Sequence, residues 1–189
     1  MYNYFHSIYK ILFEPNSAFE ELKQNPSTSQ ALITIIWVNI FLYTINYSFN
    51  PYFLNIFLYL ISLFFYTVSI LVSWFILGLF FEYIAKIFDK SGNLKTLLYL
   101  TAFSTIPWIF LAPLELLKEY GDIGYFLGLI LELIIYFWTI FLYCKSLQAT
   151  YNITFSRSIM LIFLPFLSTL FAFFWIIGFF TKLSYIFTV

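Results

Sequence analysis

Long apolar runs separated by short polar segments make up most of the chain. After residue 30 there are five such runs, each long enough to cross the roughly 30 Å of hydrocarbon in a bilayer as an α-helix. They cover residues 31–49, 54–81, 97–117, 124–144 and 158–181. The second and the fifth contain no charged residue. The pattern therefore predicts five transmembrane helices joined by short polar connections.

The N-terminal segment follows a different pattern. Over residues 2–14, polar side chains recur every three or four positions, which is typical of an amphipathic helix lying in the membrane interface. Its apolar stripe consists of Tyr4, Phe5, Ile8, Ile11 and Leu12. Ser17 and Glu20 match a capping box, which predicts that a second short helix begins near Ser17. We expect residues 1–29 to form a cytoplasmic amphipathic helical segment and residues 30–189 to form the five-span membrane domain.

Composition leads to the same class of protein. Hydrophobic residues make up 62% of the 189 residues and charged residues only 10%, a balance suited to lipid rather than water as the main solvent. Nine Lys and Arg balance nine Asp and Glu, so no basic field points to nucleic acid as a partner. The expected fold class is an all-α integral membrane protein, a bundle of five transmembrane helices preceded by short cytoplasmic interfacial helices.

The distribution of basic residues predicts the orientation. Seven of the nine Lys and Arg residues lie in the N-terminal segment and in the second and fourth connections, whereas only Lys118 and Lys182 lie on the other side. Because cytoplasmic segments carry the excess of Lys and Arg, we expect the N-terminus in the cytoplasm and the C-terminus outside.

Glu132 is the one ionisable residue deep within a predicted span, where an ionised carboxylate costs about 3 kcal/mol on insertion scales. Gly124, Gly128 and Glu132 recur every four residues and therefore share one helix face. Two glycines on this face allow a neighbouring helix to approach closely. Glu132 is therefore expected to face protein rather than lipid.

Two interpretations of Glu132 follow. It could be a site for a proton or a cation, or a polar anchor for a lipid headgroup or a partner, as intramembrane carboxylates often are. The interpretation we favour is a neutral, hydrogen-bonded packing residue, since no second intramembrane charge is available to build a relay. An intramembrane enzyme would need a second group, such as Glu115 folded back beside Glu132.

Pro107 and Ser104 fall in the third predicted span. Pro107 should bend that helix because proline removes a backbone donor, and Ser104 can bind a carbonyl group that the bend exposes. A role in shape alone is the favoured interpretation for both residues.

Other chemistry finds little support in the sequence. His6 is the only histidine, which excludes a site built from several histidines. The chain contains neither a Gly-x-Ser-x-Gly elbow nor a glycine-rich phosphate loop. We therefore predict no catalytic, cofactor-binding or metal-binding residue, and no enzyme activity.

Three segments carry a resemblance to a known family. They are Ile11–Leu22, Tyr83–Leu98 and Leu100–Pro107, the last of which enters the third span through an aromatic residue, a serine and a proline. Their order resembles the Yip domain family (Ypt-interacting proteins, type one), and the short N-terminal arm looks like that of its prokaryotic members. The resemblance covers nearly the whole chain and implies five spans preceded by a short cytoplasmic helix.

The resemblance also implies a function. It indicates a non-catalytic membrane organiser or adaptor that binds membrane lipids, other membrane proteins or itself. The alternative is a small transporter or channel that uses the carboxylate of Glu132.

The partners and location follow from the same resemblance. Eukaryotic relatives are associated with small prenylated GTPases and typically carry an Asp-Leu-Tyr-Gly-Pro motif, which this sequence lacks, so small GTPase binding is not expected. The expected location is the plasma membrane, or the Golgi or endoplasmic reticulum if the chain is eukaryotic.

Overall fold

Helices account for nearly all of the computed structural model, which describes residues 4–48, 56–88 and 92–188. The elements are α1 (Tyr4–Phe13), α2 (Pro15–Gln24), α3 (Thr28–Ser48), α4 (Ile56–Ile87), α5 (Leu94–Ser104), the 3-10 helix η1 (Ile106–Phe110), α6 (Leu111–Lys118), α7 (Gly121–Tyr151) and α8 (Phe155–Thr188). No strand occurs in the described ranges. The predicted all-α class is confirmed.

Five helical segments in the described ranges are long and apolar enough to cross a membrane. They are Thr28–Asn46, Ile56–Ile87, Leu94–Lys118, Gly121–Tyr151 and Phe155–Thr181. Each overlaps one predicted span, so the predicted number and order of spans are confirmed. Residues 49, 54 and 55 of the predicted spans lie outside the described residues.

Helices α4 and α7 continue past the predicted ends of their spans, to Ile87 and Tyr151. The two predicted spans end just before a charged residue, Glu82 or Lys145, yet Glu and Lys are good helix formers. The Tyr151 hydroxyl donates a hydrogen bond to Glu82 Oε2 at 2.7 Å, so the added turns of the two helices contact each other. A charge therefore marks the edge of the apolar segment rather than the end of the helix.

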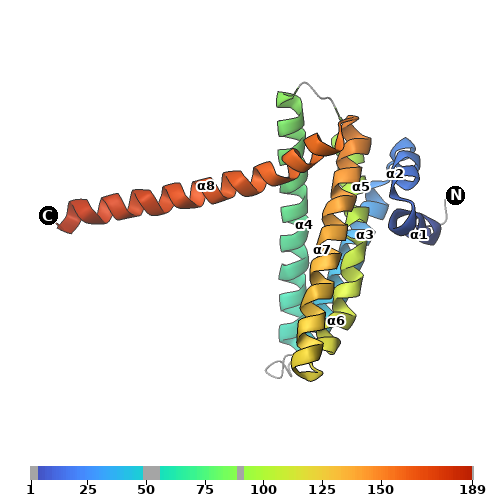
Figure 1. Cartoon of the computed structure of the whole chain (residues 1–189), viewed down its shortest axis with the longest axis horizontal. Helices are drawn as coiled ribbons and strands as arrows, with labels where there is room; N and C mark the ends of the chain where they lie inside the picture. The colour runs from blue at the N-terminus through green and yellow to red at the C-terminus, as the bar shows by residue number, and fades with distance from the viewer. Residues whose placement is uncertain (1–3, 49–55, 89–91, 189) are drawn as a thin grey trace.

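Four spans pack side by side, and α8 leaves them (Figure 1). Helix α5 is central: it contacts α1, α2, α3, α4 and α7. The side chains of Leu97, Leu100, Ala102 and Phe103 on α5 are fully buried. The core of the molecule therefore lies around α5.

The third span is not one continuous α-helix. α5 ends at Ser104, and η1 follows with Pro107 near its start. The Thr105 amide and hydroxyl both donate to the Ala102 carbonyl, at 3.3 and 2.7 Å. The Trp108 amide donates to the Thr105 carbonyl at 3.0 Å. These bonds pair backbone groups around the proline, as an apolar environment requires.

Helices α1 and α2 pack against the spans, and we call this pair the platform. One hydrophobic cluster contains Ile11, Phe19 and Leu22 of the platform together with Leu100 and Phe103 of α5. The platform lies beside the end of the bundle where α4 and α7 finish (Figure 1). We call this end the platform end and the opposite end the distal end.

The start of α2 differs from the prediction. The helix begins at Pro15 rather than near Ser17, and the Ser17 hydroxyl donates to the Glu14 main-chain carbonyl at 3.1 Å. Proline suits the first position of a helix because its φ is already helical. The amide at this position has no acceptor within the helix, so the lack of an amide proton costs no hydrogen bond. The predicted capping box of Ser17 and Glu20 is therefore wrong.

The residues of α1 are divided between a packed side and an exposed side. Ser7 and Ile11 face inward and are buried, whereas Phe5, which belongs to the predicted apolar stripe, is 76% exposed. Tyr9 and Phe13, four and eight positions further along, are exposed as well. Contact with the spans decides which side of α1 is buried, and an aromatic row is left outside.

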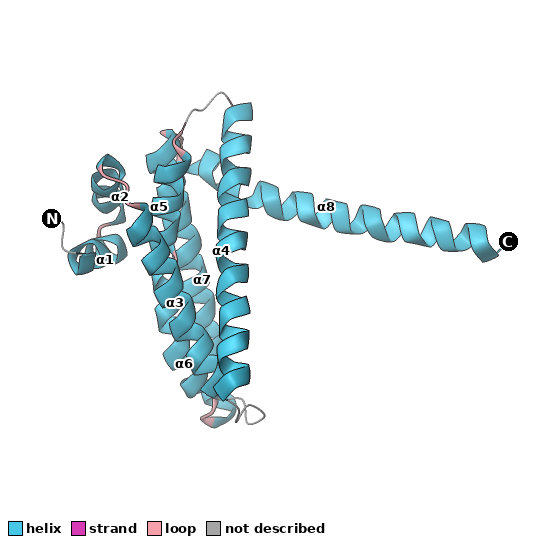
Figure 2. Cartoon of the chain, turned by 180° about the vertical axis from the view of Figure 1, so that it is seen from behind, coloured by secondary structure: helices cyan, strands magenta, loops and turns pink. Residues whose placement is uncertain are grey.

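Helix α8 packs on α4 and α7 near its start and then runs away from the other spans (Figures 1 and 2). Pro165 lies inside the helix, and the Ser168 hydroxyl donates to its carbonyl at 2.8 Å. From Phe171 to Thr181 every side chain is exposed. Its length and apolar composition still qualify α8 as the fifth span.

Replacing Phe19 by alanine tests whether the core of α5 holds the platform. Phe19 is 1% exposed, and truncating a buried phenylalanine costs about 3 to 5 kcal/mol. We expect the free energy of unfolding to fall by this order and protease cleavage within residues 4–24 to become faster in membranes. Phe13→Ala, at a residue 66% exposed, is the matched control. Equal cleavage rates in the two variants would contradict the proposed role of Phe19.

Candidate functional site

Glu132 lies on α7, and its carboxylate meets a lysine from α6. Glu132 Oε1 is 2.5 Å from Lys118 Nζ, and Glu115 Oε1 is 3.1 Å from the same nitrogen. The side chains of Glu132 and Lys118 are only 15% and 16% exposed. We call Glu115, Lys118 and Glu132 the carboxylate cluster.

The sequence analysis expected no second intramembrane charge for Glu132, but the structure pairs Glu132 with Lys118. The sequence pattern assigns Lys118 to a polar connection, but in the structure it is the last residue of α6. Gly121, with a φ of 73°, adopts a left-handed conformation that glycine tolerates. The chain reverses here, α6 and α7 lie against each other, and the long Lys118 side chain reaches Glu132.

Gly124 and Gly128 lie where α7 meets α6. A Cβ atom at Gly128 would be 2.7 Å from Lys118 Cγ, and one at Gly124 would overlap the carbonyl oxygen of Leu117. The two glycines therefore leave the space that the α6 backbone and the Lys118 side chain occupy. The structure brings Gly124, Gly128 and Glu132 together on one face, and the helix that approaches this face is α6.

The carboxylate cluster contains two carboxylates and one ammonium group. Their opposite charges offset part of the cost of removing Glu132 from water. Glu115, at 34% side-chain exposure, is the most open of the three. Lys118 thus joins the two glutamates, and this arrangement can hold the α6–α7 hairpin together. It also brings three ionisable groups together between two neighbouring spans.

Ser104 and Pro107 are not part of this cluster. The Ser104 hydroxyl donates to the Leu100 carbonyl at 3.1 Å within its own helix, and the side chain is fully buried. Pro107 is buried in η1. In the described part of the chain, no hydrogen bond or ion pair joins either residue to Glu132. Both positions belong to the helix interruption in the third span.

A second polar cluster, at the platform end, was missed by sequence reasoning. Glu82 is 8% exposed and accepts the hydrogen bond from Tyr151, and Lys86 Nζ lies 3.5 Å from Glu82 Oε1. The spacing of Glu82 and Lys86, four residues apart on a helix, was a usable signal. Tyr151 is 69 positions from Glu82 in the sequence, and no local spacing pattern predicts their contact.

Within the described ranges, no three His, Cys, Asp or Glu side chains lie close enough together to hold a metal ion.

These observations define the class of protein. The chain is a multi-pass α-helical membrane protein with five spans and an N-terminal helical platform packed on them. A Yip1 domain family model matches residues 9–176, and the chain therefore belongs to the Yip1 domain family. The family resemblance seen in the sequence is thus confirmed. No curated protein and no solved structure matches the chain.

Lys118→Met and Glu132→Gln, alone and combined, test the carboxylate cluster. Lys118→Met leaves two carboxylates without their shared cation, and breaking a buried ion pair in this way costs roughly 3 to 5 kcal/mol. Glu132→Gln should cost less, because Lys118 keeps Glu115 as a partner. We expect the double variant to be more stable than Lys118→Met alone, measured as the free energy of unfolding in mild detergent. Strictly additive effects would show that the two side chains are not coupled.

Proposed function

We propose that the protein is a non-catalytic membrane organiser that binds other membrane proteins through its platform. The observation that carries the proposal is the attachment of the platform to the spans. Phe19 and Leu22 share a buried cluster with α5, so the platform is a fixed surface rather than a loose arm. A fixed surface loses little conformational entropy when a partner binds.

Polar contacts support this attachment. Tyr4 Oη lies 2.7 Å from Thr34 Oγ1 on α3, and Lys23 donates a hydrogen bond to Asn152 Oδ1 at 3.2 Å, at the end of α7. The platform therefore contacts three different spans through both apolar and polar groups. Its position relative to the membrane is set by the whole bundle.

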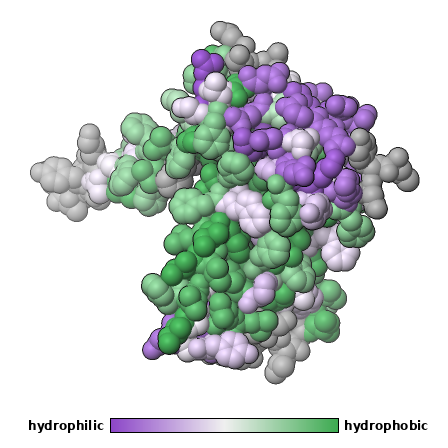
Figure 3. Space-filling view, turned by 45° about the vertical axis from the view of Figure 1, so that its right-hand side comes forward, coloured by the Kyte–Doolittle hydropathy of each residue, from purple (hydrophilic) through white to green (hydrophobic). Residues whose placement is uncertain are grey.

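The outer surface of α2 is polar, in contrast to the exposed aromatic row of α1. Exposed polar side chains on and beside α2 are Glu14, Asn16, Ser17, Glu20, Gln24 and Asn25. Figure 3 shows the hydrophilic surface gathered at the platform end, above the hydrophobic surface of the spans. Because this face carries carboxylates and no exposed lysine or arginine of its own, it suits a protein partner better than an anionic membrane surface.

Photo-crosslinking in native membranes tests the platform as a binding surface. A benzophenone amino acid at Glu20 or Gln24 should give a discrete protein adduct, because these side chains are exposed on α2. The same amino acid at Phe65, which is 66% exposed on α4, is the matched control and should give none. The Glu20 adduct should weaken when Phe19→Ala is added. Platform yields no higher than the Phe65 yield would overturn the proposal.

A small transporter or channel is the second candidate, and the carboxylate cluster is the observation that favours it. Ionisable groups within spans often mark routes for ions or protons. Ion flux into liposomes that is carried by the protein and lost in Glu132→Gln would favour this function. Flux at background in both proteins would count against it.

We propose further that the protein lies in the plasma membrane and that its platform end faces the cytoplasm. The basic residues at this end are Lys10, Lys23, Lys86, Lys95, Lys145 and Arg157, and Lys118 lies at the distal end. Cytoplasmic segments carry such an excess of basic residues. With α8 taken as the fifth span, this proposed orientation gives a C-terminus outside the cell.

Cysteine labelling tests this orientation. Tyr120, between α6 and α7, is 80% exposed, whereas the native Cys144 is 1% exposed. In intact cells an impermeant maleimide should label Tyr120→Cys, and it should label Glu20→Cys only after the membrane is opened. The unmodified protein measures the contribution of Cys144. The reverse pattern would place the platform outside.

A further inference from the structure

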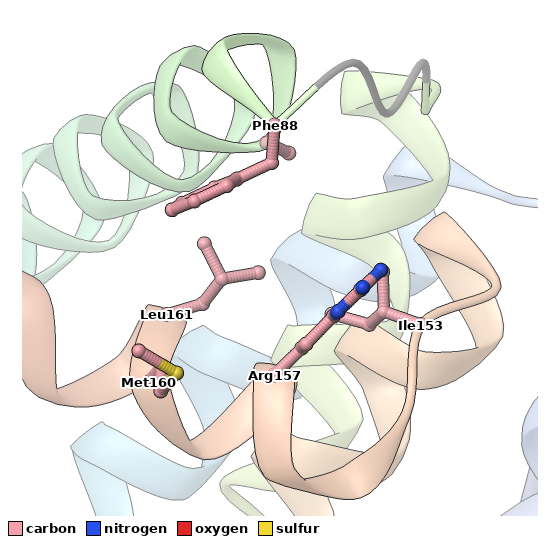
Figure 4. A pocket seen from close by; sticks show the side chains of 6 residues that line it. Phe88, Ile153, Arg157, Met160 and Leu161 are labelled. Atoms are coloured by element: carbon pink, nitrogen blue, oxygen red, sulfur yellow. The ribbon is translucent and has the colours of Figure 1, made fainter.

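A cavity of about 270 Å³ lies between the end of α4 and the start of α8. Its lining is Ala85, Phe88, Ile153, Arg157, Met160 and Leu161. Figure 4 shows Phe88, directly after α4, and Leu161 from α8 on opposite sides of this space, with the Arg157 side chain beside Ile153. Five apolar side chains and one cation therefore surround one opening at the platform end.

Arg157 has no acidic partner in the part of the chain that the structure describes. It is exposed in the first turn of α8, where backbone amides of a helix have no acceptor within the helix and carry partial positive charge. Lys145 adds a second cation nearby, 5.8 Å from the centre of the Phe155 ring that opens α8. The start of α8 is thus positively charged and suits an anion.

The apolar lining adds a second requirement on the ligand. Ala85 and Leu161 are 1% and 5% exposed and close the cavity toward the protein, whereas Phe88 and Met160 are 57% and 61% exposed. The cavity is thus open on the outer side of the bundle, beside the lipid-exposed faces of α4 and α8. Its volume is just below the roughly 300 Å³ of a small-molecule site, which suits part of an acyl chain rather than a whole ligand.

We propose that this cavity binds an anionic phospholipid from the leaflet on the platform side. The phosphate contacts the Arg157 guanidinium, which can bind it through two hydrogen bonds. The adjoining part of one acyl chain packs against Phe88, Met160 and Leu161. The proposal rests on the membrane location of the chain and is independent of the protein partner proposed for the platform.

Lipid binding to the purified full-length protein tests the proposal. Native mass spectrometry would compare phosphatidylglycerol with phosphatidylcholine, which has the same chains and no net charge. We expect tighter binding of phosphatidylglycerol, and Arg157→Gln should reduce that preference by about fivefold, the factor that one cation near an anionic surface provides. Lys95→Gln, at another exposed cation, is the matched control and should keep the preference.

A second variant tests the apolar part of the cavity. Met160→Trp fills the space and keeps Arg157, so it should weaken the binding of both lipids. If the Arg157→Gln variant kept the full preference for phosphatidylglycerol, Arg157 would not contact the phosphate. If the Met160→Trp variant bound both lipids as tightly as the unmodified protein, the acyl chain would not occupy this cavity. Complete displacement of phosphatidylglycerol by inorganic phosphate would show a site for free phosphate, which would also overturn the proposal.

Discussion

The packing around α5 is the constraint on which the rest of the structure depends. This helix contacts both helices of the platform and three of the other spans, and its side chains at Leu97, Leu100 and Phe103 are fully buried. Its position between these elements lets one hydrophobic cluster serve the platform and the membrane bundle together. The platform and the first four spans therefore form one packed unit.

Polar groups within this unit make two kinds of hydrogen bond. Hydroxyl groups such as those of Thr101, Ser104 and Thr139 donate to carbonyl groups one turn earlier in their own helices. Side-chain links between elements include Glu132 with Lys118, Glu82 with Tyr151, and Trp74, whose indole Nε1 donates to Thr101 Oγ1 at 3.1 Å. Both kinds pair polar groups away from water, where an unpaired group is costly.

The two ends of the bundle offer different chemistry. The distal end holds the carboxylate cluster, in which the single lysine is already shared by two glutamates. The platform end holds a polar outer surface and, at the start of α8, an arginine with no acid partner among the described residues. The first arrangement joins the two helices of a hairpin, whereas the second presents an exposed polar surface and an exposed arginine. This contrast agrees with the proposal that partners bind at the platform end.

The sequence by itself determined the five spans, the amphipathic start and the helix face that carries Gly124, Gly128 and Glu132. These features depend on local periodicity and apolar length, which a single helix expresses wherever it packs. Only the tertiary structure decided that Lys118 reaches Glu132, that Tyr151 binds Glu82 and that Phe5 lies outside. Each of these depends on how one helix is placed against another, and on which side chains span the gap between them. A sequence pattern describes the faces of a helix, but the contacts of the whole chain select which face is buried and which charges meet.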